Sequence, residues 1–467
     1  MFGVYVTELP EVIDLNINSN NIVGLRGSGR AIGIYVRNQA TTASTVRSKV
    51  NIQFNGIKQI GRPTADEEDQ AYGIQVGELT AYSDVRISGN QVDSIYGTEV
   101  AGVHNYSSGA NVCENLFILD NSISNVTCYS AAAGHAAGIV AVGFASTAEI
   151  SNNIITTVSD VAATSTIEGI QLGAIGRATL QGNQLINCIS NASGGAFDNE
   201  FGISVTNSSC SVENNRIIGT YNGIKYLFNN AVQVAGISIC GNVVGPSTTR
   251  APRVGIAVTI AAGASMLSSN INDNIINNIA ALTIAHGVFV NAPTDSTSYG
   301  LSISNNVIKE TGGANPGSAI FVTGVNTLVI NSNILTGSTT GHAGIGLTTD
   351  RAGIRLESVN DVIINSNMSY WNRNFISGTG AANQGEIRIA GASMLYNVVG
   401  NRIIGSNLGT AYYAISIAGV FYGLNAMSNF ISGSEENIDE QHTPNGGPTG
   451  NIAGVNMPAA VNFIFHF

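Results

Sequence analysis

The sequence predicts an all-β chain that folds as a single-stranded parallel β-helix, a solenoid of about 14 coils with long turn insertions. Two alternating motifs support this prediction. In the first motif, an aliphatic residue and two variable positions precede an asparagine, and successive asparagines lie 27 to 35 positions apart. The motif ends at Asn20, Asn55, Asn90, Asn121, Asn153, Asn183, Asn215, Asn242, Asn274, Asn306, Asn333, Asn367, Asn401 and Asn429.

The second motif is a small residue followed by an aliphatic, a variable and an aliphatic residue. It occurs as Gly33-Ile34-Tyr35-Val36 and again as Gly353-Ile354-Arg355-Leu356. The period of two inside each unit indicates short strands and excludes helical repeats. In compact units such as residues 319–333, two strands with inward-facing aliphatic residues therefore flank a polar bend.

The asparagine is expected to close the second strand of each unit. Asparagine tolerates the left-handed backbone conformation that a sharp corner between strands needs. Its amide can also bond the asparagine of the neighbouring coil. Stacked coils then form an asparagine ladder on a core of aliphatic ladders.

This pattern resembles the right-handed parallel β-helix of the pectin-lyase-like superfamily, over roughly residues 17–457. Residues 1–16 are expected to form an N-terminal cap or lead-in strand. Residues 458–467, which include Phe463 and Phe467, are expected to form a C-terminal aromatic strand that acts as a cap or subunit contact. Because a solenoid adds coils without enlarging its core, 467 residues are compatible with one domain.

Composition narrows the function classes. Only 10% of residues are charged, and the formal net charge is −11 without a basic run among aromatics, which argues against nucleic acid as a partner. No stretch approaches the ~20 apolar residues of a membrane span. The five cysteines are odd in number and lack metal-binding spacing, so neither a disulfide framework nor a cysteine metal site is predicted. The N-terminus does not match a secretory signal.

A first group of candidate residues is acidic. Glu168, Asp198 and Glu200 are weak catalytic candidates beside neighbouring strands, near an outward His104 and a His135 expected in a loop. Inverting glycoside hydrolysis needs two carboxyl groups about 6.5–9.5 Å apart. The register offset of Glu168 and Glu200 predicts that they point to different faces. No cofactor is required, although calcium is conceivable at a weak candidate site formed by Asp66, Glu67, Glu68 and Asp69.

A second group combines aromatic and charged residues. The outward position of the second motif gives Phe289, Phe321, Arg355 and Arg388 on four consecutive coils. Glu357 and Glu386 flank the arginines, and Tyr370 and Trp371 follow Asn367 in a region of long loops. Aromatic faces and arginines suit sugar rings and their carboxylates, and they suit a subunit interface equally.

The resemblance also implies possible activities. Polygalacturonase-like enzymes carry Asn-Thr-Asp, Asp-Asp and Gly-His-Gly on adjacent coils, whereas this chain has only Gly134-His135-Ala136 and Gly341-His342-Ala343 and no Asp-Asp pair. Lyases of the superfamily use calcium with an arginine or lysine as base. Arg355 and Arg388 fit that part, but no acidic ligand triad stands beside them.

Three functions follow as hypotheses. The first is a virion or extracellular β-helix protein of tailspike or fibre type, a homotrimer that contacts a cell-surface or environmental polysaccharide. The second is a secreted polysaccharide lyase or inverting glycoside hydrolase. The third is a structural or filament-forming surface protein. A trimer, a monomer with a groove, and end-to-end polymers would distinguish them.

Overall fold

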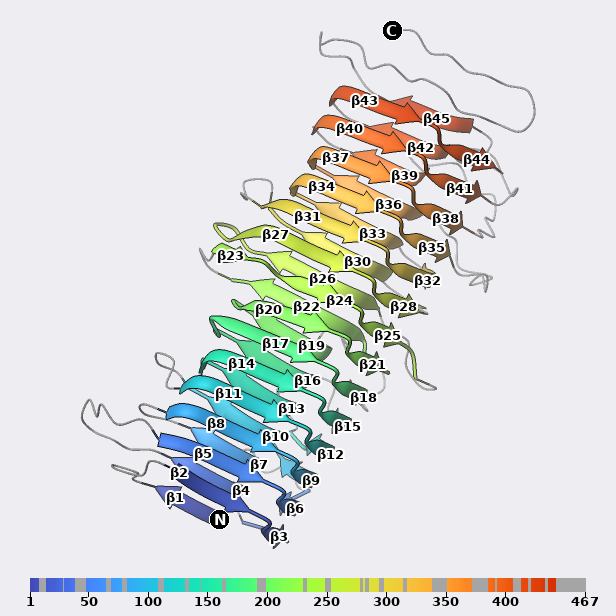
Figure 1. The fold of residues 1–467 in the computed structure, drawn as a ribbon. Helices are drawn as coiled ribbons and strands as arrows, with labels where there is room; N and C mark the ends of the chain where they lie inside the picture. Colours follow the sequence, from blue (N-terminus) through green and yellow to red (C-terminus); the bar gives the residue numbers. More distant parts are fainter. Residues whose placement is uncertain are drawn as a thin grey trace. The chain divides into compact units, whose positions relative to one another are not determined.

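The structure is a computed structural model that describes the chain in segments. These are residues 1–7, 14–27, 29–37, 48–63, 69–77, 82–107, 113–130, 134–143, 145–161, 165–190, 199–229, 233–247, 253–277, 280–281, 285–293, 298–313, 317–337, 351–371, 385–390, 393–405, 413–418, 421–432 and 436–441. The regular elements of these segments are all β-strands, and the strands pair in parallel (Figure 1). The described residues contain no helix that is long and apolar enough to cross a membrane.

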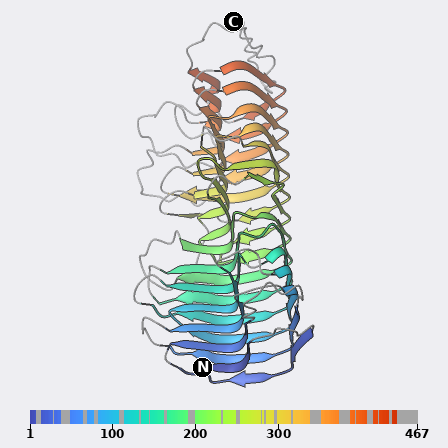
Figure 2. The ribbon, with the colours of Figure 1, turned by 90° about the vertical axis from the view of Figure 1, so that its left-hand side faces the viewer.

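The chain divides into two compact units. The first comprises Met1–Tyr226 with Ser247–Arg250, and the second comprises Leu227–Pro246 with Ala251–Phe467. In a solenoid each coil contacts only its neighbours, so that distant coils group into separate units, and the single predicted domain stays a prediction. Within each unit the strands lie in three stacks, one per sheet (Figures 1 and 2).

The strands of the first unit form these three sheets. The first sheet has the order β1 (Phe2–Thr7), β4 (Arg30–Arg37), β7 (Gln70–Gly77), β10 (Glu99–Tyr106), β13 (His135–Val142), β16 (Thr166–Gly173), β19 (Glu200–Thr206) and β22 (Asn222–Phe228). The second has β2 (Asp14–Asn18), β5 (Ser48–Gln53), β8 (Tyr82–Ser88), β11 (Cys113–Leu119), β14 (Ala145–Ser151), β17 (Arg177–Gln181) and β20 (Ser209–Glu213). The third has β3 (Asn21–Val23), β6 (Gly56–Gly61), β9 (Gln91–Gly97), β12 (Ser122–Cys128), β15 (Ile154–Asp160), β18 (Gln184–Ser190) and β21 (Arg216–Ile218).

The second unit repeats the arrangement. Its first sheet has β26 (Val254–Ile260), β30 (Ala285–Asn291), β33 (Gly317–Thr323), β36 (Arg351–Glu357), β39 (Gly385–Ala390), β42 (Tyr413–Ala418) and β45 (Glu436–Gln441). Its second has β24 (Ser238–Cys240), β27 (Ser265–Asn272), β31 (Tyr299–Ser304), β34 (Asn326–Asn331), β37 (Asn360–Asn365), β40 (Ser393–Val399) and β43 (Phe421–Met427), with β23 (Gln233–Ala235) beside β27. Its third has β25 (Val243–Gly245), β28 (Ile275–Asn277), β32 (Val307–Gly313), β35 (Ile334–Gly337), β38 (Met368–Trp371), β41 (Arg402–Gly405) and β44 (Phe430–Ser432), with β29 (Ala280–Ala281) beside β32.

These sheets confirm the predicted fold class, an all-β parallel β-helix whose described strands lie in three parallel sheets. The predicted count of about 14 coils differs from the first sheet, which has eight strands in the first unit and seven in the second. The reason is that β1 precedes the first asparagine motif and β45 follows the last. The predicted C-terminal strand at 458–467 lies outside the described residues.

The core consists of aliphatic columns that run from coil to coil. In the first unit, Ile34, Ile74, Val103 and Ile139 are paired in register, and each is 0% exposed. Every coil therefore adds the same small set of buried side chains, as the second motif predicts. All five cysteines are free thiols.

The predicted asparagine ladder is present in both units. Asn153 is typical: its backbone N and its side-chain Nδ2 both donate to Oδ1 of Asn183 at 3.0 Å. The same Nδ2 donates to the backbone oxygen of Ile118 at 2.8 Å. Each buried amide thus bonds the asparagine of the following coil and a strand of the preceding one.

The asparagine itself was predicted to take the left-handed conformation at the corner. In the structure the residue before the asparagine takes it. Its φ lies between +54° and +66° at Ser19, Phe54, Gly89, Asp120, Asn152, Gly182, Asn214, Gly241, Asp273, Asn305, Ser332, Ser366, Gly400 and Ser428. The ladder asparagine must point its amide into the interior to reach its neighbours. The preceding residue therefore makes the left-handed step, at a cost of roughly 1–2 kcal/mol where it is not glycine.

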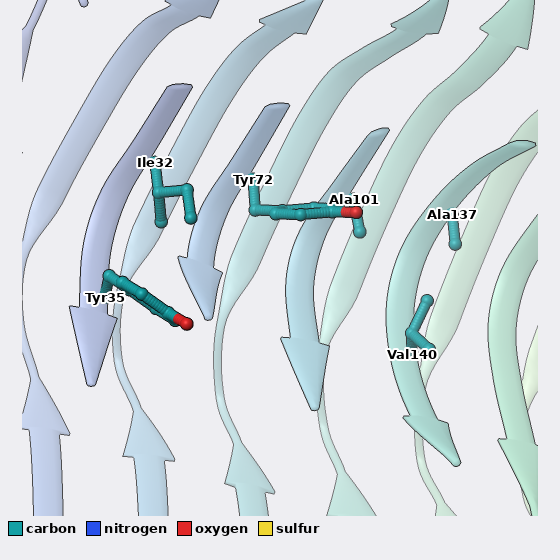
Figure 3. Close-up of a cluster of buried hydrophobic side chains, with 6 residues drawn as sticks. All are labelled: Ile32, Tyr35, Tyr72, Ala101, Ala137 and Val140. Atoms are coloured by element: carbon teal, nitrogen blue, oxygen red, sulfur yellow. The ribbon is translucent and has the colours of Figure 1, made fainter. Parts of the chain in front are cut away.

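The small residue of the second motif sets which side chains face outward. A Cβ on Gly33 would lie 2.5 Å from the oxygen of Gly73 and 2.6 Å from the buried Ile57 side chain, so no larger residue fits. Figure 3 shows the neighbouring residues: Ile32, one position before Gly33, and Tyr35, two positions after it, belong to one cluster of buried side chains with Tyr72. The strict alternation is broken at the glycine, which gives the first sheet two outward columns instead of one.

Candidate functional site

The outward face of the first sheet in the second unit carries a continuous column of aromatic and arginine side chains. Phe289 of β30 pairs with Phe321 of β33, Phe321 with Arg355 of β36, and Arg355 with Arg388 of β39. These four residues, here named the aromatic–arginine column, have the alignment that the sequence predicts.

The two phenylalanine rings stack on each other and together form an aromatic platform. Their centroids are 5.4 Å apart and their planes differ by 10°. Both side chains are only partly buried, so each ring keeps an accessible surface. The guanidinium carbon of Arg355 lies 5.2 Å from the Phe321 ring centroid, which extends the platform by a cation–π contact.

His286 of β30 completes the platform. Its ring stacks on Phe289 and on Phe321, with centroid distances of 5.1 and 5.4 Å. The backbone N of Ser318 donates to its Nδ1 at 3.3 Å, which assigns the proton of the neutral ring to Nε2. Burial, aided by the nearby positive charge of Arg355, lowers the His286 pKa to about 4. The ring is therefore neutral at pH 7.

Charged groups lie at one end of the platform. Nε of Arg355 donates to Oε1 of Glu357 at 2.8 Å, and Nη2 donates to the same oxygen. The two side chains are 19% and 32% exposed, so both remain within reach of a ligand. The neighbouring Arg388 is partly buried and continues the column. The arrangement thus offers cationic and anionic groups directly beside the rings.

The other candidates of the second group are placed differently. Tyr370 and Trp371 end strand β38 of the third sheet, whereas the sequence analysis expects them in a region of long loops. Glu386 lies in β39, two positions before Arg388. The side chains of these three residues lie outside the described part of the structure.

In the first unit, the predicted carboxylates do not face one another. Glu168 is outward and buried, and its Oε2 lies 2.9 Å from Nε2 of His135, which begins β13 and is not in the expected loop. Glu200 pairs in register with the core residue Ile167 and is 1% exposed. The predicted offset between the two glutamates is therefore present, and it separates them onto opposite faces of the sheet. Asp198 lies outside the described residues.

A polar cluster in the first unit was not predicted from the sequence. Oη of Tyr72 donates to Oε1 of Glu99 at 2.7 Å, and Nε2 of Gln70 donates to Oε2 of Glu99 at 2.8 Å. The Tyr72 ring stacks on His104 at 4.3 Å, and Nδ1 of His104 lies 3.2 Å from Nε2 of Gln75. Burial, followed by the charge of Glu99, raises the pKa of Tyr72 above its ordinary value, and burial lowers the pKa of His104 to about 3.

Farther along this face, a lysine lies on an aromatic ring. Nζ of Lys225 is 4.3 Å from the centroid of Phe201. Burial lowers the pKa of Lys225, and the charge of Glu168 opposes that shift. Aromatic and cationic side chains therefore meet on the first sheet of this unit as well.

The suggested calcium run is largely outside the described residues, which include only Asp69 of the four. The Asp69 side chain is buried, and its Oδ1 accepts a hydrogen bond from the backbone N of Gly29 at 2.6 Å. Among the residues that the structure describes, no three His, Cys, Asp or Glu side chains are grouped so that they could hold a metal ion.

The fold defines the class of this protein: it is a right-handed parallel β-helix whose first sheet carries aromatic and charged side chains. No family model matches the sequence, and no curated protein matches it. Two solved structures are similar in fold, both A-modules of mannuronan C-5 epimerases of Azotobacter vinelandii. The AlgE6 module has a TM-score of 0.37 and 14% identity, over 89% of this chain and 92% of that one. The AlgE4 module has a TM-score of 0.26 and 14% identity, over 95% and 91%.

Proposed function

We propose that this protein binds polysaccharide through the aromatic–arginine column of the second unit. The observation that carries the proposal is the platform of Phe289 and Phe321, two parallel, stacked and partly exposed rings on successive strands. The apolar face of a sugar ring stacks on such surfaces. Two aromatic rings on successive strands suit a polymer that crosses successive coils.

The charged groups indicate the kind of polysaccharide. Arg355 and Arg388 place two guanidinium groups on a chain whose net charge is −11. Guanidinium groups bind carboxylates in a bidentate manner, and Glu357 already fixes the orientation of Arg355. An acidic polysaccharide fits this set better than a neutral one. Nε2–H of the neutral His286 is a further donor for sugar oxygens.

The setting that we propose is a tailspike or fibre-type protein, on a virion or outside the cell, assembled as a homotrimer. Supporting it are the repetitive coils, the low content of charged residues and an aromatic surface that faces outward. The two solved structures of similar fold are, by their names, modules that act on mannuronan. The proposal rests on the column and not on that likeness.

Binding is tested by titrating acidic and neutral polysaccharides into the protein by calorimetry. Phe289→Ser combined with Phe321→Ser should reduce the affinity roughly tenfold or more, since the aromatic surfaces on which the sugar rings stack are lost while the fold is kept. Phe117→Ser is the matched control, because Phe117 is a partly buried, outward phenylalanine on β11 in the other unit. Equal affinity of wild type and the double variant would refute the proposal.

A second candidate function is a polysaccharide lyase or hydrolase. One observation favours it: Tyr72 donates a hydrogen bond to Glu99, and its ring stacks on His104, so that three titratable side chains meet on the first sheet of the first unit. An assay for new reducing or unsaturated ends separates the two functions. Products that disappear in Tyr72→Phe would establish the enzyme, and binding without products would leave the first function.

A further inference from the structure

An exposed aliphatic stripe crosses the third sheet of the second unit. It consists of the residue directly after the ladder asparagine on five consecutive coils: Val243, Ile275, Val307, Ile334 and Met368. Ile275 is 40% exposed and Ile334 is 39% exposed, while the other three are partly buried. We name these five residues the aliphatic stripe.

The fold does not require apolar residues at this position. The equivalent column of the first unit is mostly polar and consists of Asn21, Gly56, Gln91, Ser122, Ile154, Gln184 and Arg216. Because the neighbouring inward position supplies the core in both units, the stripe adds nothing to core packing. Its apolar character therefore needs a cause outside the unit.

The surroundings of the stripe carry few charges, and the acids and bases among them balance. The residues two positions before the ladder asparagines of the same coils are Cys240, Asn272, Ser304, Asn331 and Asn365. The flanking corner and strand positions contribute two acids, Asp273 and Glu310, and one base, Lys309, and the base Arg402 follows Met368 in the column. In a chain with a net charge of −11, this is a face on which two copies can approach without repulsion.

We infer that the aliphatic stripe is a side-by-side contact between copies of this chain. Another copy presents the same apolar column with the same strand spacing of about 4.8 Å, so the side chains of two stripes interdigitate along their length. A contact of this kind removes the exposed isoleucines from water and extends over the uncharged Ser and Asn positions beside them. It uses a different sheet from the aromatic–arginine column and does not depend on glycan binding.

The test is the solution mass of stripe variants by light scattering. Wild type should have a multiple of the 48.3 kDa chain mass, and Ile275→Asp combined with Ile334→Asp should reduce it to a single chain. The matched control is Val23→Asp combined with Ile154→Asp, which changes two exposed aliphatic residues of the first unit and adds the same charge. The control should keep the wild-type mass. Circular dichroism verifies that each variant folds, and Ile275→Thr with Ile334→Thr replaces the aspartate pair if it does not.

A cysteine pair locates the contact independently. Ile334→Cys should form a disulfide between chains under mild oxidation, and Gln184→Cys, at the equivalent column in the first unit, should not. A monomeric wild type would overturn the inference. It would equally be overturned by an oligomer that survives the stripe substitutions, or by one that Ile334→Cys does not cross-link.

Discussion

Asn306 is the position at which the ladder can be tested most directly. Its Oδ1 accepts from the backbone N of Asn274 at 3.0 Å and from Nδ2 of Asn274 at 2.9 Å. Its Nδ2 donates to Oδ1 of Asn333 at 3.0 Å and to the backbone oxygen of Ile271 at 2.8 Å. Asn306 is 0% exposed, so water does not replace these partners.

Asn306→Ala removes all of these bonds and leaves one group fully unsatisfied. Nδ2 of Asn274 keeps its bond to Ile239, and Oδ1 of Asn333 keeps the bond from the backbone N of residue 306. The backbone N–H of Asn274 loses its acceptor. An orphaned buried donor costs about 1–3 kcal/mol, and the lost bonds add about 1 kcal/mol, so we expect a total of about 2–4 kcal/mol.

The effect should be local, because each coil contacts only its neighbours. Guanidinium denaturation gives the overall change, and hydrogen exchange of peptides from β27, β31 and β34 locates it. Asn20→Ala is the control: Asn20 is partly exposed and donates through Nδ2 to Asn55 and Asn18. Its substitution should cost less than about 1 kcal/mol. Unchanged exchange in the Asn306→Ala peptides would refute the ladder as a source of stability.

Three further perturbations follow from the structure. Ile320→Asp should prevent stable folding of the second unit, since an unpaired charge at a 0% exposed position costs several kcal/mol. A soluble variant with an unchanged melting temperature would contradict the assignment of Ile320 to the core. Phe54→Asn should raise the free energy of unfolding by about 0.5–1 kcal/mol, because Phe54 has a left-handed φ of 55° and is 67% exposed. A drop in the denaturation midpoint would disprove that the Phe54 backbone is strained. The His286 pKa of about 4 is below the ordinary value near 6.5, so the unfolded chain binds more protons between these values and stability falls as the pH is lowered through that window. His286→Phe should reduce this slope of the melting temperature, and an identical slope would show that the histidine is not buried in its neutral form.

The sequence predicts where each residue lies along a coil better than it predicts the face to which its side chain points. The motifs predict the inward columns, the asparagine ladder and the alignment of Phe289, Phe321, Arg355 and Arg388, because all of these depend on spacing alone. The residue before the asparagine is serine, aspartate, asparagine or glycine in most coils. That preference indicates a left-handed residue before each asparagine, and Phe54 is the exception to it.

Contacts between different outward columns were harder to predict. His286 and Phe289 lie on one face only because Gly287 interrupts the alternation, which strict period-two reasoning does not anticipate. The stacking of Tyr72 on His104 has the same origin, since Tyr72 lies one position before its glycine and His104 lies two positions after its own. The sequence pattern does not distinguish the aliphatic stripe from the core. An aliphatic pair such as Ile275 and Ile276 is typical of two core residues, although only Ile276 is buried.

The hydrogen bonds between successive ladder asparagines all point the same way along the chain. In each unit an asparagine donates to the coil made after it and accepts from the coil made before it, as between Asn121, Asn153 and Asn183. During synthesis, the most recent complete coil therefore presents unsatisfied amide donors to the segment that emerges next. Each coil is a template for its successor with the same chemistry at every step. The solenoid can thus lengthen or shorten by whole coils, whereas a partial coil would end the ladder.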